Sequence, residues 1–316
     1  MSAGDNFWYR TLLKLKFYEV SGESFQKLFQ DVMIYRYPDF ESVQPHGNWG
    51  DGGNDGWFPL EKRYFQVYGP KASKTTESLS TITGKITGDF DKILQKWPKA
   101  RCYHFVYNDR FEGVPAPLSQ AMITLQEQYE LEEVGVWNAG RLEQLFMELT
   151  DDQKMSIIGG VPSDVPNFID PQAVSELLTH LADKDSVLSP FLCESAPEFG
   201  GKIQLNGLTQ PVTDYIKFYY YQSQDIDFFL QNRPGLTQSI AGEIKKIYEK
   251  SKEKIRKNND GYPNIRYVWM VEELIPPHMK KHPHSLKAYR EAAQVVIAKY
   301  FETCDAYEHP DDISTT

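Results

Sequence analysis

The chain contains little cysteine: Cys102, Cys193 and Cys304 are the only three among its 316 residues. They are odd in number and far apart, and no two form a CxxC pair, which excludes a disulfide framework and a cysteine metal site. We therefore expect a reducing compartment, the cytoplasm. No apolar run approaches the roughly 18 residues of a membrane helix, and the N-terminus lacks the apolar core of a signal peptide. These absences predict a protein without a membrane anchor.

Several catalytic motifs are also missing from the sequence. It contains no GxxxxGK[ST] phosphate-binding loop, so any NTP hydrolysis has to come from a partner, and it contains no GxSxG nucleophile motif. A calcium loop starting at Asp51 is excluded because its closing position is Lys62 and not a glutamate. His278, His282 and His284 lie together, but the flanking prolines favour a solvated loop over a transition-metal site.

The composition is that of a globular protein with local differences in charge. With 41% hydrophobic and 25% charged residues, the chain is long enough to bury a core in each of two domains. The net charge of -10 excludes a surface that is basic throughout. Between Glu61 and Arg101, however, nine Lys or Arg residues accompany only four Asp or Glu. This basic tract is either a solvated face or a surface for phosphate contacts.

Hydrophobic periodicity divides the chain into two parts. Helical patterns alternate with runs of aromatic and β-branched residues up to residue 160, which predicts a layered α/β domain over 1-160. The segment "GGVPSDVPNFIDP" then places a domain boundary near residue 160, and 161-316 is predicted to be mostly α-helical. Strands are expected at 62-70, 100-108 and 132-138, with helices at 21-37, 78-97, 118-130, 139-149, 211-232, 234-257 and 285-308.

A glycine-rich loop and the strand after it form the candidate site. The stretch "HGNWGDGGNDGWFPLEKRYFQVYGPK" (46-71) places five glycines around Asp51, Asn54 and Asp55, directly before the strand. Alternation along the strand puts Gln66 and Tyr68 on one face. Taken alone, "DGGNDG" is ordinary turn chemistry and a strand glutamine can pair with backbone. Together with the upstream helix "SGESFQ", the pattern predicts a polar cluster on adjacent strands.

These residues resemble the Mrr-type branch of the PD-(D/E)xK nuclease superfamily. Its pattern is a helix with "F-E" or "F-Q", then "G-D-G-G-x-D-G", then "Q-x-K"; here the matches are Phe25-Gln26, Gly50 to Gly56, and Gln66-Val67-Tyr68. The resemblance covers about residues 20-150. It implies a restriction-endonuclease-like fold, an α/β domain whose mixed central sheet is flanked by helices, and hydrolysis of DNA with Mg²⁺ or Mn²⁺.

The resemblance also implies roles for individual residues. Asp55 would be the primary metal ligand, Gln66 would add its side-chain oxygen, and Gln26 would orient a water on the metal. The glycines would let a phosphate approach closely because they have no Cβ. The residues expected to contact substrate are Gly53, Asn54, Lys62, Arg63 and Lys74.

The sequence departs from the family pattern at its lysine. Tyr68 stands two residues after Gln66, where Mrr-type enzymes have the lysine that steadies the attacking water. Lys71 follows Gly69-Pro70, and a turn there would return its ammonium group to the site. We therefore expect Lys71 to be the catalytic lysine, and the alternative is a fold retained for binding only.

The helical half carries a second resemblance. Its final helix, "AAQVVIAKYFETCDAYE", is similar to the end of effector subunits from Lamassu-type ABC-ATPase three-component antiviral systems, on the residues Phe301, Cys304, Asp305 and Glu308. The resemblance implies an assembly domain over 161-316, whose family part covers about 165-316, that docks on an ABC or SMC-like ATPase and a small third subunit. A homo-oligomer is also expected.

Together these features predict a metal-dependent endonuclease subunit that cuts DNA in prokaryotic antiviral defence. The alternative is a non-catalytic DNA-binding or scaffold subunit with a degenerate nuclease site. An RNA substrate is a further possibility that the sequence leaves open.

Overall fold

The computed structural model describes residues 3-47, 50-71, 78-163, 166, 168-184, 199-231, 234-257, 260-302 and 307-308. Contacts between residues divide the chain into two units, Leu13–Ile157 and a second unit of Ile158–Thr316 together with Met1–Leu12. The division falls inside the first helix, α1 (Ala3–Glu19). The observed α/β unit therefore differs from the expected 1-160 domain at its N-terminal end, because the first 12 residues group with the helical unit.

The α/β unit is built on a five-stranded mixed sheet in the order β1-β2-β3-β4-β5. The first three strands are antiparallel neighbours, whereas β3, β4 and β5 run parallel. The expected α/β domain with a mixed central sheet is confirmed to this extent. The strands are β1 (Glu41–Ser42), β2 (Gly56–Phe58), β3 (Arg63–Tyr68), β4 (Cys102–Tyr107) and β5 (Glu133–Trp137).

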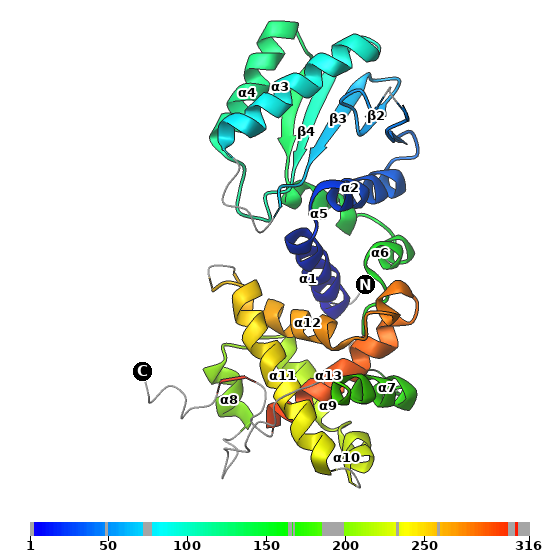
Figure 1. Ribbon diagram of the computed structural model, residues 1–316, viewed down its shortest axis with the longest axis vertical. Coiled ribbons are helices and arrows are strands. Elements are labelled where there is room, and N and C mark those ends of the chain that lie inside the picture. The colour runs from blue at the N-terminus through cyan, green and yellow to red at the C-terminus, as the bar shows by residue number, and fades with distance from the viewer. Residues whose placement is uncertain are drawn as a thin grey trace. The chain divides into compact units, whose positions relative to one another are not determined.

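Helices cover both faces of this sheet (Figure 1). On one face, Tyr64 and Tyr103 pack into a hydrophobic core with Ile86 and Phe90 of α3. On the opposite face, Phe29 of α2 lies 5.5 Å from the ring of Phe65. Side chains therefore alternate between two helical layers along each strand, as the period of two requires. The helices of this unit are α2 (Gly22–Arg36), α3 (Leu79–Lys96), α4 (Ala116–Tyr129), α5 (Ala139–Met147) and α6 (Asp151–Ile158).

Asp109 organises the loop that follows β4. Its buried carboxylate accepts hydrogen bonds from the backbone N–H groups of Phe111 (3.3 Å), Gly113 (3.1 Å) and Ala139 (3.0 Å), and from Nδ2 of Asn138 (3.3 Å). The bond to Ala139 satisfies an N–H at the first turn of α5, where helices leave their donors unpaired. The same loop holds Phe111 at a φ of 63°, which is unfavourable for a residue with a side chain.

Asp109→Ala is expected to lower the free energy of unfolding by about 3 kcal/mol, because it leaves several buried donors without an acceptor. Urea unfolding followed by circular dichroism would measure the change. The matched control is Glu127→Ala, which removes an exposed carboxylate from α4 of the same unit and should cost less than about 0.5 kcal/mol. Equal effects of the two substitutions would show that Asp109 does not organise the loop.

The second unit is helical and is built around α13 (Leu286–Glu302). This helix packs against α7, α9 and α12, and 13 of its 17 residues are buried. Among the helices in the described ranges, none is long and apolar enough to cross a membrane. The other elements are α7 (Pro171–Ala182), α8 (Phe199–Leu205), α9 (Val212–Tyr220), α10 (Gln224–Leu230), α11 (Pro234–Lys254), α12 (Tyr262–Leu274) and the 3₁₀ helix η2 (Met279–Lys281).

A buried arginine joins the start of this unit to its centre. The guanidinium of Arg290 donates to Glu272 of α12 at 2.6 Å and 3.1 Å, and to the backbone oxygens of Gly160 at 2.7 Å and Ile158 at 2.9 Å. A fully hydrogen-bonded charge of this kind is stable in the interior, but removal of any partner is costly. The proline-rich segment near residue 160 is thus fixed to α13.

The expected elements are largely present, with three differences. The helix expected at 211-232 is two helices, α9 and α10, because the chain turns at 221-223. The helices α1, α6, α7, α8 and α12 and the short helix η2 were not expected. The burial of α13 extends beyond the single apolar face that helical periodicity favours, since polar residues such as Arg290 and Gln294 are buried as well.

Candidate functional site

Asp55 lies in the antiparallel part of the sheet, beside β3. It directly precedes β2, its backbone N–H donates to the Phe65 carbonyl at 2.8 Å, and its Oδ2 accepts the N–H of Val67 at 2.7 Å. Strand β3 thereby holds both the backbone and the carboxylate of Asp55. The side chain is only 3% exposed, so the loop presents a desolvated carboxylate.

Burial changes the acidity of this carboxylate. Desolvation, helped by the nearby carboxylates of Asp51 and Asp89, raises the pKa of Asp55 to about 7, while the hydrogen bond from Val67 opposes the shift. Asp89 belongs to α3, so a charge on the helix that covers the Tyr64 face of the sheet interacts with the Asp55 carboxylate. A positive charge at this position would relieve the unfavourable burial.

Gln66 lies on β3 between Tyr64 and Tyr68, on the sheet face that meets α3. Its Oε1 is buried and has no hydrogen-bond partner among the described residues. The hydroxyl of Tyr68 is likewise buried without a partner in the described part of the chain. Buried polar atoms are nearly always paired in native proteins, so two orphaned atoms on one strand face mark a place where a ligand or water is expected.

Lys85 is a residue that the sequence reasoning did not single out. It is exposed on α3, and its Nζ lies 4.5 Å from the centre of the Tyr68 ring, a favourable cation–π arrangement. The structure therefore brings a lysine ammonium to the tyrosine that replaces the motif lysine. The sequence signal was weak because Lys85 follows Tyr68 by 17 positions and is one of nine basic residues in its tract.

Protein atoms occupy the space beside two glycines of the loop, Gly53 and Gly56. A Cβ added at Gly53 would lie 2.3 Å from the backbone oxygen of Asp89, and one at Gly56 would lie 2.2 Å from the Phe40 ring. Asn54 is fully buried, and its Oδ1 accepts the N–H of Gly56 at 3.1 Å. At both positions helix α3 and the core already occupy the space that a Cβ would need, so the lack of a side chain serves the packing of the protein itself.

Gln26 does not lie on the face that carries Gln66. It is half-buried on α2, the helix that packs against Phe65 on the opposite face. Gln30, one turn further along, is the α2 residue that contacts the loop: its Nε2 donates to the backbone oxygens of Asp55 at 2.8 Å and Val43 at 3.3 Å. Sequence reasoning missed Gln30, although both glutamines lie on the same predicted helix.

The basic residues of the tract are partly neutralised. Arg63 contacts Glu61 at 2.7 Å, Glu133 at 2.9 Å and the Nε2 of His104 at 2.8 Å, on the face opposite Gln66. Arg101 forms a bidentate pair with Glu132, and Lys92 pairs with Asp89 at 2.6 Å. The tract is therefore not a continuous basic surface, and Arg63 is engaged with acidic partners.

The remaining predicted lysines lie apart from one another. Lys62 is exposed in the turn before β3. It therefore lies at one end of β3, whereas Tyr68 lies at the other end. Lys71 is exposed after Pro70, close in sequence to Tyr68. Lys74 lies outside the described residues, as do Cys304 and Asp305 of the second resemblance.

The residues present suit a hard divalent cation with an incomplete protein shell. Among the described residues, no group of three or more His, Cys, Asp or Glu side chains is placed to hold a metal. The donors available are the desolvated Asp55 carboxylate and the unpartnered Gln66 amide oxygen. Mg²⁺ is commonly held by one or two protein oxygens, with water and substrate phosphate completing the octahedron. The chemistry of this donor set fits Mg²⁺ or Mn²⁺.

The fold and site define an α/β unit with a candidate cation site, joined to a helical unit. Residues 172–308 match the family model described as C-terminal domain 10 of the ABC-three component (ABC-3C) systems. This match confirms the predicted likeness of the helical half to a component of a three-component system. It supports protein partners and a role in prokaryotic antiviral defence. No curated protein and no solved structure matches the chain.

Proposed function

We propose that the chain is a metal-dependent nuclease subunit that hydrolyses DNA phosphodiester bonds in prokaryotic antiviral defence. The observation that carries this proposal is the presence of two desolvated oxygen donors at neighbouring positions of the sheet, one just before β2 and one on β3. Asp55 offers a buried carboxylate, and Gln66 offers an amide oxygen without a partner in the described residues. A divalent cation would satisfy both groups, and phosphodiester hydrolysis is the reaction class that commonly uses such a cation.

In this proposal Asp55 and Gln66 hold a cation that polarises the scissile phosphate and lowers the pKa of the attacking water. The chain's own residues do the positioning. Val67 orients the Asp55 carboxylate through its backbone N–H, and Gln30 fixes the Asp55 carbonyl from the other side. Lys85 contributes a positive charge beside Tyr68 that would contact the phosphate, the role expected from sequence for Lys71.

The second candidate function is a DNA-binding or scaffold subunit without catalysis. Tyr68 in the lysine position favours it, and so does the packing of Asp89 against Gly53, which closes the loop on one side. In that reading, Asp55 only stabilises the turn before β2. The two functions differ in whether any combination of subunits cuts nucleic acid.

The test is to incubate the full chain, alone and with the other two components of its system, with supercoiled plasmid and Mg²⁺ or Mn²⁺. We expect nicked or linear DNA that disappears with EDTA, and more of it in the assembled system. The net charge of -10 repels free DNA at distances up to about a Debye length, roughly 8–10 Å, so assembly should concentrate and orient the substrate. DNA retention without cleavage in every combination would favour the scaffold.

The control for the role of assembly uses two exposed aromatic residues of the helical unit. Tyr221 and Phe228 are 79% and 81% exposed, so both aromatic side chains are accessible to a partner. Tyr221→Ser combined with Phe228→Ser should reduce association with the other components and return cleavage to the level of the chain alone. Leu60→Ser, which changes a 90% exposed apolar residue of the α/β unit, is the matched control.

A parallel reaction with single-stranded RNA in place of the plasmid shows whether the substrate is DNA or RNA.

A further inference from the structure

Tyr307 and Glu308 pack against Asn206 and against helices α11 and α13 of the helical unit. The ring of Tyr307 is buried, and its centre lies 4.8 Å from that of Tyr248 on α11 and 5.1 Å from that of Phe301 on α13. The backbone of Tyr307 has a φ of 78°, a conformation that residues with side chains rarely adopt. Such a conformation persists only where its surroundings impose it, so contacts hold this residue in place.

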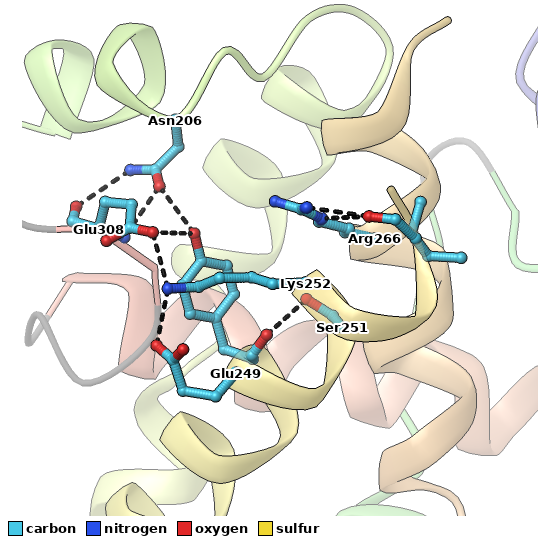
Figure 2. A network of polar contacts seen from close by, with 8 residues as sticks. Asn206, Glu249, Ser251, Lys252, Arg266 and Glu308 are labelled. Atoms are coloured by element: carbon cyan, nitrogen blue, oxygen red, sulfur yellow. Dashed lines mark hydrogen bonds and ion pairs between the residues drawn. The ribbon is translucent and has the colours of Figure 1, made fainter. Parts of the chain in front are cut away.

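Asn206 binds the backbone of the segment on both sides (Figure 2). Its Oδ1 accepts the N–H of Glu308 at 2.9 Å, and its Nδ2 donates to the carbonyl of Glu308 at 3.1 Å. One side-chain amide thus contacts a donor and an acceptor of the same residue, as a neighbouring β-strand would. Its Nδ2 also donates to the Lys202 carbonyl at 2.9 Å, which fixes the amide on α8.

The side chain of Glu308 is bound by two residues one turn apart on α11. Lys252 contacts the Glu308 carboxylate at 2.8 Å, and the Tyr248 hydroxyl donates to it at 3.3 Å. Figure 2 shows Glu249 on the other side of Lys252, where its carboxylate lies 2.8 Å from the ammonium. The ammonium also lies 4.7 Å from the centre of the Tyr248 ring. Glu249 and Tyr248 therefore help to hold the ammonium that meets Glu308 in place.

We propose that Asn206, Tyr248 and Lys252 form a peptide-recognition pocket for an aromatic residue followed by an acidic one, and that the chain fills it with its own Tyr307 and Glu308. The pocket reads three features together: a buried ring, the backbone of the next residue and a carboxylate. These are the elements by which recognition sites select short linear peptides. A partner peptide with the same pair of residues would compete for the pocket.

The short connection between α13 and Tyr307 also determines the affinity that a competing peptide needs. Only four residues, 303-306, separate α13 from Tyr307. A short tether gives its own segment an effective concentration on the order of millimolar. A free peptide therefore binds weakly to the wild-type chain and much better once the tethered pair is weakened. The release of the segment is a consequence of peptide binding, and no nuclease activity is needed to observe it.

The test uses charge reversal in the full chain. Glu308→Lys and Lys252→Glu should each speed amide hydrogen exchange at Glu308 by at least tenfold, because each breaks the same ion pair. The double variant restores opposite charges and should return exchange to near the wild-type rate. Lys254→Glu, an exposed lysine of the same helix, is the matched control and should change nothing.

A labelled DAYEHP peptide, which copies 305-310, then tests recognition in trans. It should bind the Glu308→Lys chain at least tenfold more tightly than wild type, and a DAYKHP peptide should fail to bind. The Lys252→Glu chain should prefer the DAYKHP peptide. Equal binding of the two peptides to every chain, or no binding of DAYEHP to the Glu308→Lys chain at millimolar concentration, would overturn the proposal. Failure of the double variant to restore slow exchange would do the same.

Discussion

Asp55→Asn is expected to reduce metal-dependent DNA cleavage by at least about 1,000-fold while the α/β unit stays folded. The amide keeps an oxygen that can accept the Val67 N–H, now found at 2.7 Å from the carboxylate, so the local hydrogen bond survives. What the variant loses is the negative charge that would hold a divalent cation. Initial rates on supercoiled plasmid measure the change, and Asp39→Asn, at an exposed position before β1, is the control.

The same variant should make the metal-free protein more stable at alkaline pH. Desolvation raises the pKa of Asp55 from 3.8 to about 7 in the folded chain. A carboxylic acid with a higher pKa in the folded state contributes stability at low pH that is lost as the pH rises from about 4 to 7. The shift corresponds to a cost on the order of 4 kcal/mol above pH 7, and the neutral amide avoids much of it.

Thermal unfolding with and without metal separates this effect from catalysis. At pH 8 and without metal, Asp55→Asn should unfold several degrees above the wild-type protein. Mg²⁺ or Mn²⁺ should then stabilise the wild type in proportion to its occupancy, and should leave the variant unchanged. If neither ion stabilises the wild-type protein, the proposal of a metal site at Asp55 is wrong. If Asp55→Asn cleaves DNA as fast as the wild type, Asp55 has no catalytic role.

Lys85→Ala is expected to lower kcat for DNA cleavage by about 100-fold, with a smaller change in KM. Its ammonium lies over Tyr68, two residues along the strand from Gln66 and on the same face, whereas Lys71 is exposed beyond the end of β3. A charge that meets the phosphate mainly in the transition state affects kcat. Lys85→Arg keeps the charge and should retain most of the activity that Lys85→Ala loses.

Lys71→Ala and Lys99→Ala provide the comparison, since both lysines are exposed residues of the same basic tract. If Lys71 only contacts DNA phosphate, its loss should raise KM and reduce the salt dependence of binding by about one counterion. Lys99→Ala should have little effect. A kcat that falls with Lys71→Ala and not with Lys85→Ala would return the catalytic role to Lys71, as the sequence first indicated.

Local features of the structure were predictable from the sequence because they depend on short-range periodicity. The alternation that separates Gln66 and Tyr68 from Phe65 and Val67 is present in β3, since a strand has a period of two. Ser21 marks the start of α2, and the glycine loop precedes β3 as expected, although the short strand β2 lies between them. The likeness of the helical half to a three-component system was also predictable, although the residues quoted for it included two outside the described chain.

The sequence did not determine which distant side chains meet. Lys85 reaches Tyr68, Asp89 fills the space beside Gly53, and Glu133 neutralises Arg63, and each pair is separated by at least 17 positions. These contacts depend on the rotation of α3 over the sheet and on the register of β3 with its neighbours. A shift of either by one residue would exchange the partners, yet it would leave every local pattern in the sequence nearly as favourable.

The burial of side chains and the contacts between distant segments were likewise decided by the tertiary structure. The sequence placed Asp55 in a turn, but only the packing of α3 and β3 around it removes its solvent and raises its pKa. Tyr307 and Glu308 gave no sign in the sequence of a pocket formed by Asn206 and α11, about 60 to 100 residues earlier. Sequence patterns report the preferences of neighbouring residues, whereas desolvation and pocket formation require several segments to be packed at once, which only the folded chain provides.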